Sequence, residues 1–308
     1  MLEADETDLP AHHSAEEILA HPQFRTARNA LVQAMLALYE HDPFLNRLLL
    51  EIGRNVLFVV IMCLQARYDE SDPATWLTLR LVKKAMSAFI VASPRRIADL
   101  VSRLIATGYL EQLPSPGDRR LRILRPTRRM ILQDQDWLIS HYVPLQVLFP
   151  EPGYGRIMQR DPEFQRLQRF AAASLFPMGA RLMARHPIMM GFMTREAGIM
   201  ILIKLIQLAE PNGNATRAIS YSDIGTRFGL SRTSVRMLLQ ESEQLGLVHL
   251  SREKGPSVEL TPLLIEAFDK FIADGMAGHD LIYNLAHHAA ASRAAYAGLM
   301  QKIPLLVS

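Results

Sequence analysis

The chain has 308 residues, which is enough for about two domains. Hydrophobic residues make up 49% and charged residues 21%, so the composition excludes a disordered chain and provides for a large buried core. The one cysteine, Cys63, excludes a disulfide framework and a cysteine-based zinc site, and it fits a reducing cytoplasm.

The net charge of +3 hides an uneven distribution along the chain. The first 17 residues hold six acids and neither lysine nor arginine, so the remainder carries +9, which suits an anionic partner. This acidic start lacks the basic and then apolar order of a signal peptide. The longest apolar runs, 56–64 and 198–203, are far shorter than the about 20 residues that span a bilayer. We therefore predict an acidic flexible tail over residues 1–19 and no membrane partner.

Two parts of the chain resemble each other at a constant spacing of 138 residues. At this spacing Ser93 aligns with Ser231, and Gly108 aligns with Gly246. With small shifts the match continues upstream, which indicates a duplication rather than a solenoid of many short units. The predicted organisation is domain 1 over 20–150, a linker rich in proline and glycine over 151–160, domain 2 over 161–290, and a C-terminal helix or tail over 291–308.

Both units are predicted to follow the same order: two apolar helices, a short helix, a tight turn, an amphipathic helix, a hairpin and a closing helix. In the first unit these elements fall at 23–40, 44–67, 76–86, 94–107 and 109–125, and the last helix starts at Thr127. In the second unit they fall at 163–185, 188–209, 221–228, 231–244 and 247–260, and the last helix starts at Thr261.

The amphipathic helices show the apolar spacing of one buried stripe. In the second unit the stripe consists of Val235, Leu238, Leu239 and Leu245. In the first unit it consists of Ile97, Leu100, Val101, Leu104 and Ile105.

Residues 221–247 have the pattern of a helix-turn-helix. Gly229 can adopt the positive φ that ends a helix, and Ser231 can cap the next one. Because only about three residues separate the helices, they must cross steeply, and the second helix can then enter a DNA major groove. Its outward face carries side chains that can contact phosphates or base edges, namely Arg232, Thr233, Ser234, Arg236 and Gln240.

The equivalent helix of the first unit presents Arg95, Arg96, Asp99, Ser102 and Arg103. A hairpin tip rich in proline and glycine follows at 114–118. Six arginines then fall within eleven residues, which predicts a phosphate-binding footprint of Arg119, Arg120, Arg122, Arg125, Arg128 and Arg129.

The run Asp118-Arg119-Arg120 followed by Thr127 resembles the wing signature of MarR-type winged helix-turn-helix regulators. That family has Asp-x-Arg and then Leu-Thr, and Pro126 stands here in place of the leucine. The second unit keeps the Leu-Thr pair at 260–261 and lacks the Asp-x-Arg. Residues 231–236 also resemble the recognition helix of GntR-type regulators.

The resemblance implies a mainly α fold with small β-wings. Its two tandem winged helix-turn-helix domains would pack through long flanking helices as an intramolecular pseudo-dimer. It also implies that Arg120 enters the minor groove and that Asp118 orients it, with Arg252 or Lys254 as substitutes in the second wing. Ser93 and Ser231 would cap helices whose N-termini face phosphate.

We therefore expect a bacterial type of sequence-specific regulator of transcription that binds double-stranded DNA, a repressor by family resemblance. It would be cytoplasmic and nucleoid-associated. Its half-sites should differ, because Pro94 aligns with Arg232 and Ala98 with Arg236. Two alternatives stay open, a plasmid-type replication initiator with tandem winged helices and a winged-helix module that binds protein.

Motifs of common enzyme classes are absent from the sequence, including His-Glu-x-x-His, Gly-x-Ser-x-Gly and the phosphate-binding loop. We expect no enzymatic activity, no cofactor and no metal site. Cys63 is predicted to be a buried hydrophobe rather than a redox sensor. A small-molecule effector and homodimerisation are left open. A group of methionines is predicted to fill the core, with an effector pocket as the alternative: Met178, Met183, Met189, Met190, Met193 and Met200.

Overall fold

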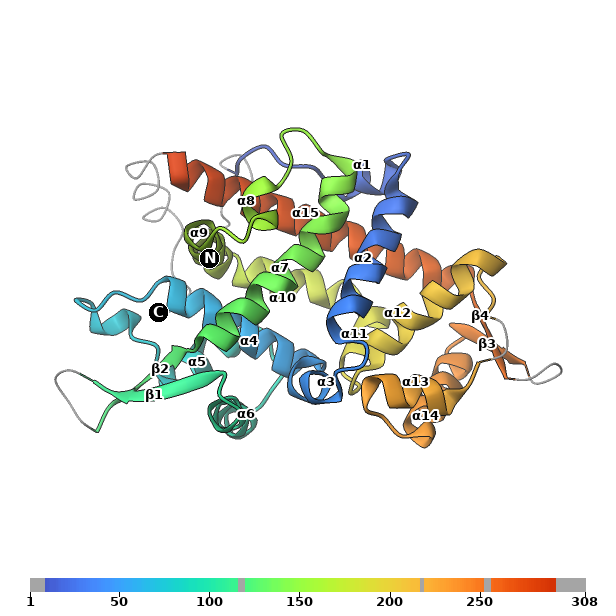
Figure 1. The fold of residues 1–308 in the computed structure, drawn as a ribbon, viewed down its shortest axis with the longest axis horizontal. Helices are drawn as coiled ribbons and strands as arrows, with labels where there is room; N and C mark the ends of the chain where they lie inside the picture. Colours follow the sequence, from blue (N-terminus) through green and yellow to red (C-terminus); the bar gives the residue numbers. More distant parts are fainter. Residues whose placement is uncertain (1–8, 116–119, 217–218, 252–255, 292–308) are drawn as a thin grey trace.

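The structure, a computed structural model, describes residues 9–115, 120–216, 219–251 and 256–291. As predicted, it is mainly helical with two small antiparallel sheets of two strands each (Figure 1). The first half contains α1 (Ala15–Ala20), α2 (Phe24–Tyr39), α3 (Pro43–Leu49), α4 (Ile52–Ala66), α5 (Leu79–Met86), α6 (Pro94–Ala106), β1 (Leu110–Pro114), β2 (Arg122–Pro126) and α7 (Arg128–Leu148). The second half contains α8 (Gly155–Met158), α9 (Pro162–Ser174), α10 (Phe176–Ala184), α11 (Pro187–Met193), α12 (Gly198–Ala209), α13 (Tyr221–Phe228), α14 (Arg232–Gln244), β3 (Val248–Ser251), β4 (Ser257–Leu260) and α15 (Pro262–Ala291).

The constant spacing between the two units appears again in the structure. The bounds of α6 and α14 differ by the same 138 residues as the aligned sequence. Both helices begin after a capping serine: the Ser93 hydroxyl accepts from the amide of Arg96 at 3.3 Å, and that of Ser231 from the amide of Ser234 at 3.0 Å. Each is followed by a glycine of positive φ, +75° at Gly108 and +70° in its counterpart. The predicted caps and hairpins are confirmed.

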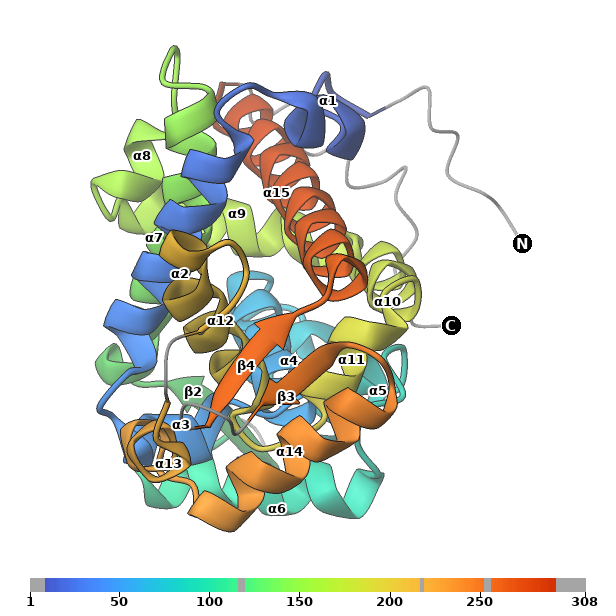
Figure 2. The same ribbon diagram turned by 90° about the vertical axis from the view of Figure 1, so that its right-hand side faces the viewer.

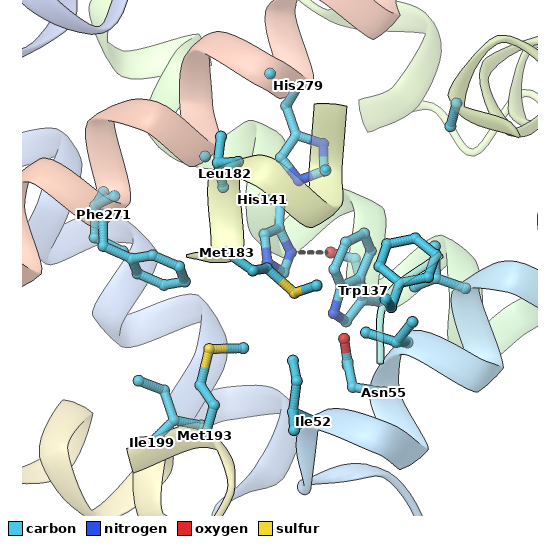
Figure 3. Close-up of a pocket in the computed structure, with 18 of the residues that line it drawn as sticks. Ile52, Asn55, Trp137, His141, Leu182, Met183, Met193, Ile199, Phe271 and His279 are labelled. Atoms are coloured by element: carbon cyan, nitrogen blue, oxygen red, sulfur yellow. Dashed lines mark hydrogen bonds between the residues drawn. The ribbon is translucent and has the colours of Figure 1, made fainter. Parts of the chain in front are cut away.

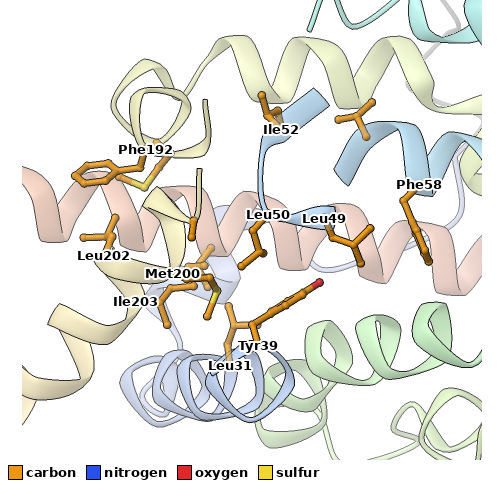
Figure 4. Close-up of a cluster of buried hydrophobic side chains, with 14 of the residues drawn as sticks. Leu31, Tyr39, Leu49, Leu50, Ile52, Phe58, Phe192, Met200, Leu202 and Ile203 are labelled. Carbon is orange, nitrogen blue, oxygen red and sulfur yellow. The ribbon is translucent and has the colours of Figure 1, made fainter. Parts of the chain in front are cut away.

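Three helices that the sequence predicts as continuous are broken. The first break separates α3 from α4, which bend by 79°, and the second separates α11 from α12 at Ala197, whose φ is +51°. The amide of Ala197 donates to the carbonyl of Leu50 at 3.1 Å, so these two breaks meet (Figure 4). A third break separates α9 from α10 at Leu175. At the first two breaks, this hydrogen bond between distant residues and the apolar cluster around it replace hydrogen bonds within a helix. The local sequence pattern does not reveal such a distant contact.

The apolar core is shared between the two halves. Helix α4 packs against α9, α2 against α12, and α1 against α15. Figures 1 and 2 show the long α15 crossing the molecule beside α1 and α2. One cluster of buried side chains therefore takes members from both predicted domains, among them Leu31, Tyr39, Met200 and Ile203 (Figure 4).

The predicted flexible tail and the predicted linker both contain helical residues. The last residues of the predicted tail, 15–19, belong to α1, which Ser14 caps, and Ile18 is fully buried. The predicted linker contains α8, and the hydroxyl of buried Tyr154 donates to the Asp280 carboxylate at 2.8 Å. The prediction of a flexible tail is wrong at residues 15–19, because buried Ile18 anchors them to the core, and Tyr154 ties the linker to α15.

Among the described residues, no single helix is long and apolar enough to span a bilayer. The bent pair α3–α4 reaches that length and hydropathy only when both helices are counted together.

Candidate nucleic-acid interface

The helices α6 and α14 lie along the same edge of the molecule, as the two perpendicular views in Figures 1 and 2 agree. The hairpins β1–β2 and β3–β4 extend from this edge toward opposite sides in Figure 1. The two related helices thus lie at two places along one edge, where a long partner can contact both.

The connection between α13 and α14 is a tight turn of three residues, as predicted. Gly229 ends α13 with a φ of +74°. The amide of Leu230 donates to the carbonyl of Gly225 at 2.7 Å, and a Cβ built on Gly225 would lie 2.6 Å from the carbonyl oxygen of Leu230. The steep crossing of the two helices therefore needs a residue without a side chain at position 225.

We expect Gly225→Ala to lower the free energy of unfolding by about 1–3 kcal/mol, because the new methyl group forces backbone apart in a packed turn. Urea denaturation followed by circular dichroism measures this change. Gly191→Ala in α11 is the matched control, since a Cβ there meets nothing within 4 Å. The control should be neutral or slightly stabilising, and equal losses in both variants would contradict the role of Gly225.

The connection between α5 and α6 differs from the predicted tight turn, because it contains the seven residues 87–93. Ile90 has a φ of +54° and is 91% exposed, while its neighbour Phe89 packs edge-to-face with Phe176 at 5.5 Å between ring centroids. The prediction is wrong here because the longer connection places an aromatic side chain against the other half.

Every predicted contact residue on α6 and α14 is exposed. These residues are Arg95, Arg96, Asp99, Ser102 and Arg103 on α6, and Arg232, Thr233, Ser234, Arg236 and Gln240 on α14. The opposite faces are buried through Ile97, Val101 and Leu104 and through Val235, Leu238 and Leu239. Leu245 is 70% exposed, so its predicted burial is wrong, because it follows the last residue of α14 and leaves the helical stripe.

One arginine of this face is held by a partner that sequence reasoning missed. The guanidinium of Arg96 lies 2.7 Å from the carboxylate of Glu51, which is 9% exposed and also caps α4. The only sequence feature that could have drawn attention to Glu51 is its position just before an apolar helix, where a residue can cap that helix. Arg96 is still 47% exposed, so it can reach a partner while the ion pair fixes α6 against α4.

The predicted arginine footprint divides in the structure. Arg122 and Arg128 are exposed, whereas Arg125 pairs across the hairpin with Glu111 at 3.7 Å. Arg129 donates to a backbone carbonyl at 3.1 Å and lies over the Tyr109 ring at 4.5 Å, so the footprint prediction overlooked its structural role. Arg120, the predicted minor-groove residue, is exposed. The other predicted wing residues lie outside the described residues, namely Asp118, Arg119, Arg252 and Lys254.

The predicted burial of Cys63 is confirmed, since its side chain is fully buried in α4. Burial raises the pKa of the thiol to about 12, which leaves no reactive thiolate near neutral pH. Met189 and Met200 fill the core as predicted. Met178, Met183 and Met193 instead line a cavity between the halves, and Met190 lines a smaller one beside it.

Within the described parts of the chain, no group of three or more His, Cys, Asp or Glu side chains is placed to hold a metal ion. Comparison of the chain with protein-family models, with curated proteins and with solved structures finds no match. The resemblance to MarR-type and GntR-type regulators therefore rests on the residues themselves.

Proposed function

We propose that the protein is a sequence-specific regulator of transcription that binds double-stranded DNA through two tandem winged helix-turn-helix units. The observation that carries this proposal is the common edge formed by α6 and α14, with exposed arginines on both helices. Each helix is followed by a two-stranded hairpin, which has the position of a wing. The two units thus act as an intramolecular pseudo-dimer, and the family resemblance favours repression.

In this arrangement each recognition helix enters a major groove, and the two grooves on one face of DNA are about 34 Å apart. The cap serines accept from the amides of Arg96 and Ser234. The amide of Arg95 in α6 and those of Arg232 and Thr233 in α14 are therefore left to face the backbone phosphates, where the helix dipole favours negative charge. Arg95 and Arg232, at the starts of the two helices, supply the positive charge. The hairpin β1–β2 reaches the flanking minor groove with its arginines.

The two half-sites should be unlike, because equivalent positions on the two helices differ chemically. Ala98 of α6 stands where α14 has Arg236, and Ser102 stands where α14 has Gln240. Arginine pairs well with guanine and glutamine with adenine, and the first-unit residues offer neither contact.

Selection of binding sites from random duplex DNA at near-physiological salt tests the proposal. We expect one enriched motif with two unlike half-sites about ten base pairs apart, and affinity that falls steeply with salt. A perfect palindrome would contradict the unequal half-sites. Absence of enrichment from folded protein would contradict DNA binding and favour a protein-binding module.

For the selected site, we expect Arg236→Ala to weaken binding by about 1–3 kcal/mol and to relax base preference in one half-site only. Fluorescence anisotropy with DNA variants in each half-site measures both effects. Arg166→Ala on α9 is the control, since Arg166 is exposed but lies on a helix away from the α6–α14 edge. An equal loss in the control, or relaxed preference in both half-sites, would count against the assigned role.

A further inference from the structure

A cavity of about 360 Å³ lies between the two halves. Figure 3 shows its wall, to which α4 contributes Ile52 and Asn55, α7 contributes Trp137 and His141, and α15 contributes Phe271 and His279. Nearly all other lining side chains are apolar, and several are methionines, which adapt to the shape of an occupant. This volume is more than twice the roughly 150 Å³ that holds a benzene molecule in an engineered protein cavity.

Two glycines keep this space open. Gly275 and Gly278 line the cavity from the interior of α15, and a Cβ built on either one meets nothing within 4 Å. Glycine destabilises the interior of a helix. At these two positions no neighbouring atom is close enough to exclude a larger side chain. Their effect in the structure is to leave room beside the helix.

The polar groups of the wall include two neutral imidazoles, beside Tyr39, Glu51, Asn55 and Arg169. The Nδ1–H of His141 donates to the carbonyl of Trp137 at 2.8 Å, which leaves Nε2 as a hydrogen-bond acceptor. The Nδ1 atom of His279 is buried without a hydrogen-bond partner among the described residues. Burial lowers the pKa of His141 to about 4 and that of His279 well below its usual value, so neither ring is charged at neutral pH.

We propose that this cavity is a binding site for an uncharged, largely apolar molecule of about two fused rings whose hydroxyl group donates to His141 Nε2. An anion would lose its hydration without gaining a free cation, because Arg169, a charged residue of the wall, is held by Asp134. A hydrocarbon without a donor would leave the imidazole acceptor unpaired.

The occupant of this cavity touches residues that position α6. Phe89, from the connection between α5 and α6, lines the cavity, and so does Glu51, which pairs with Arg96 of α6 at 2.7 Å. A ligand that displaces Phe89 or Glu51 therefore shifts α6. This coupling rests on the proposed function, and under it the ligand lowers the affinity for DNA.

Isothermal titration calorimetry with the full chain and 2-naphthol tests the site directly. We expect one molecule bound per chain, with 2-methylnaphthalene and 2-naphthoate at least tenfold weaker because they lack the donor or carry a charge. His141→Phe should abolish the preference for the naphthol over the methyl compound. Absence of naphthol binding, or tighter binding of the naphthoate, would overturn the proposal.

Filling the cavity from the helix gives a second test. Gly278→Leu or Gly275→Leu should remove naphthol binding, whereas Gly191→Leu on α11, which also meets open space and lies outside the cavity lining, should retain it. Circular dichroism confirms that each variant is folded, and His141→Phe tests the site independently of either leucine. Unchanged binding in a folded Gly278→Leu variant would overturn the proposal.

The coupling is measured separately, as DNA affinity with and without 2-naphthol. We expect about a tenfold loss of affinity, which Gly278→Leu abolishes. If the naphthol binds and DNA affinity does not change, the coupling is wrong and the site stands. If the naphthol binds and the protein has no affinity for DNA, the proposed function fails and the site stands.

Discussion

Asp134→Ala is expected to lower the free energy of unfolding by about 3–5 kcal/mol, because it leaves the Arg169 guanidinium buried without its counter-ion. Asp134 is fully buried and Arg169 is 3% exposed. The two side chains form a bidentate pair, with Nη2 to Oδ1 at 2.5 Å and Nε to Oδ2 at 3.1 Å. This pair joins α7 of the first half to α9 of the second, so its loss should loosen the whole core. Urea denaturation followed by circular dichroism measures the change.

The matched control for this variant lies on the same helix. Asp136 pairs with Arg160 at 2.5 Å, but both side chains are more than a third exposed, so Asp136→Ala should cost at most about 1 kcal/mol. The double variant Asp134→Leu with Arg169→Met should lose less stability than Asp134→Ala, because no charge is then stranded. Equal losses of unfolding free energy for Asp134→Ala and Asp136→Ala would show that burial of an ion pair does not determine how much it contributes to stability.

Acidification from pH 7 to pH 4 is expected to remove about 3 kcal/mol of stability through His141 alone. Burial lowers the pKa of this residue to about 4 in the folded protein, while it keeps its ordinary value near 6.5 when unfolded. Between these values the unfolded chain takes up a proton that the folded chain does not. The stabilising contribution is therefore present above pH 6.5 and is lost as the pH falls toward 4. The charge of Arg169 on α9 opposes its protonation further, while the His279 ring, which faces it from α15 at 5.0 Å between ring centroids, is itself neutral.

His141→Asn isolates this effect, because the asparagine amide can still donate to the Trp137 carbonyl but does not titrate. We expect the free energy of unfolding of the wild-type protein to fall more steeply than that of the variant in urea titrations between pH 7 and 4.5. His249→Asn, at an exposed position of β3, should follow the wild-type curve. Parallel curves for the wild type and His141→Asn would rule out a buried neutral imidazole at this position.

Local signals were sufficient to predict α6, α14 and their hairpins. Ser93 and Ser231 cap helices, glycines of positive φ end them, and an apolar stripe of helical period marks their buried faces. The exposed contact residues follow directly from these stripes, since they occupy the opposite side of each helix. These features depend on residues within one or two helical turns of each other, so the local sequence is enough to predict them.

The features of the fold and of the site that the sequence did not predict depend on contacts between distant residues. The break between α3 and α4 is tied to Ala197 of the other half, and the pairing of Glu51 with Arg96 spans 45 residues of sequence. The cavity arises only where helices from both halves meet, so the methionines that line it look in the sequence like those of the core. The burial of α1 and α8 likewise depends on α15, which follows them by more than a hundred residues.

The shared core also determines how the protein responds to dilution. A dimer of separate subunits dissociates when its concentration falls below the dissociation constant, and its unfolding midpoint shifts with concentration. Here both halves belong to one polypeptide, so the interface between α4 and α9 forms in a unimolecular step. The two helices therefore stay on the same edge of one molecule at any copy number, even at one molecule in a cell.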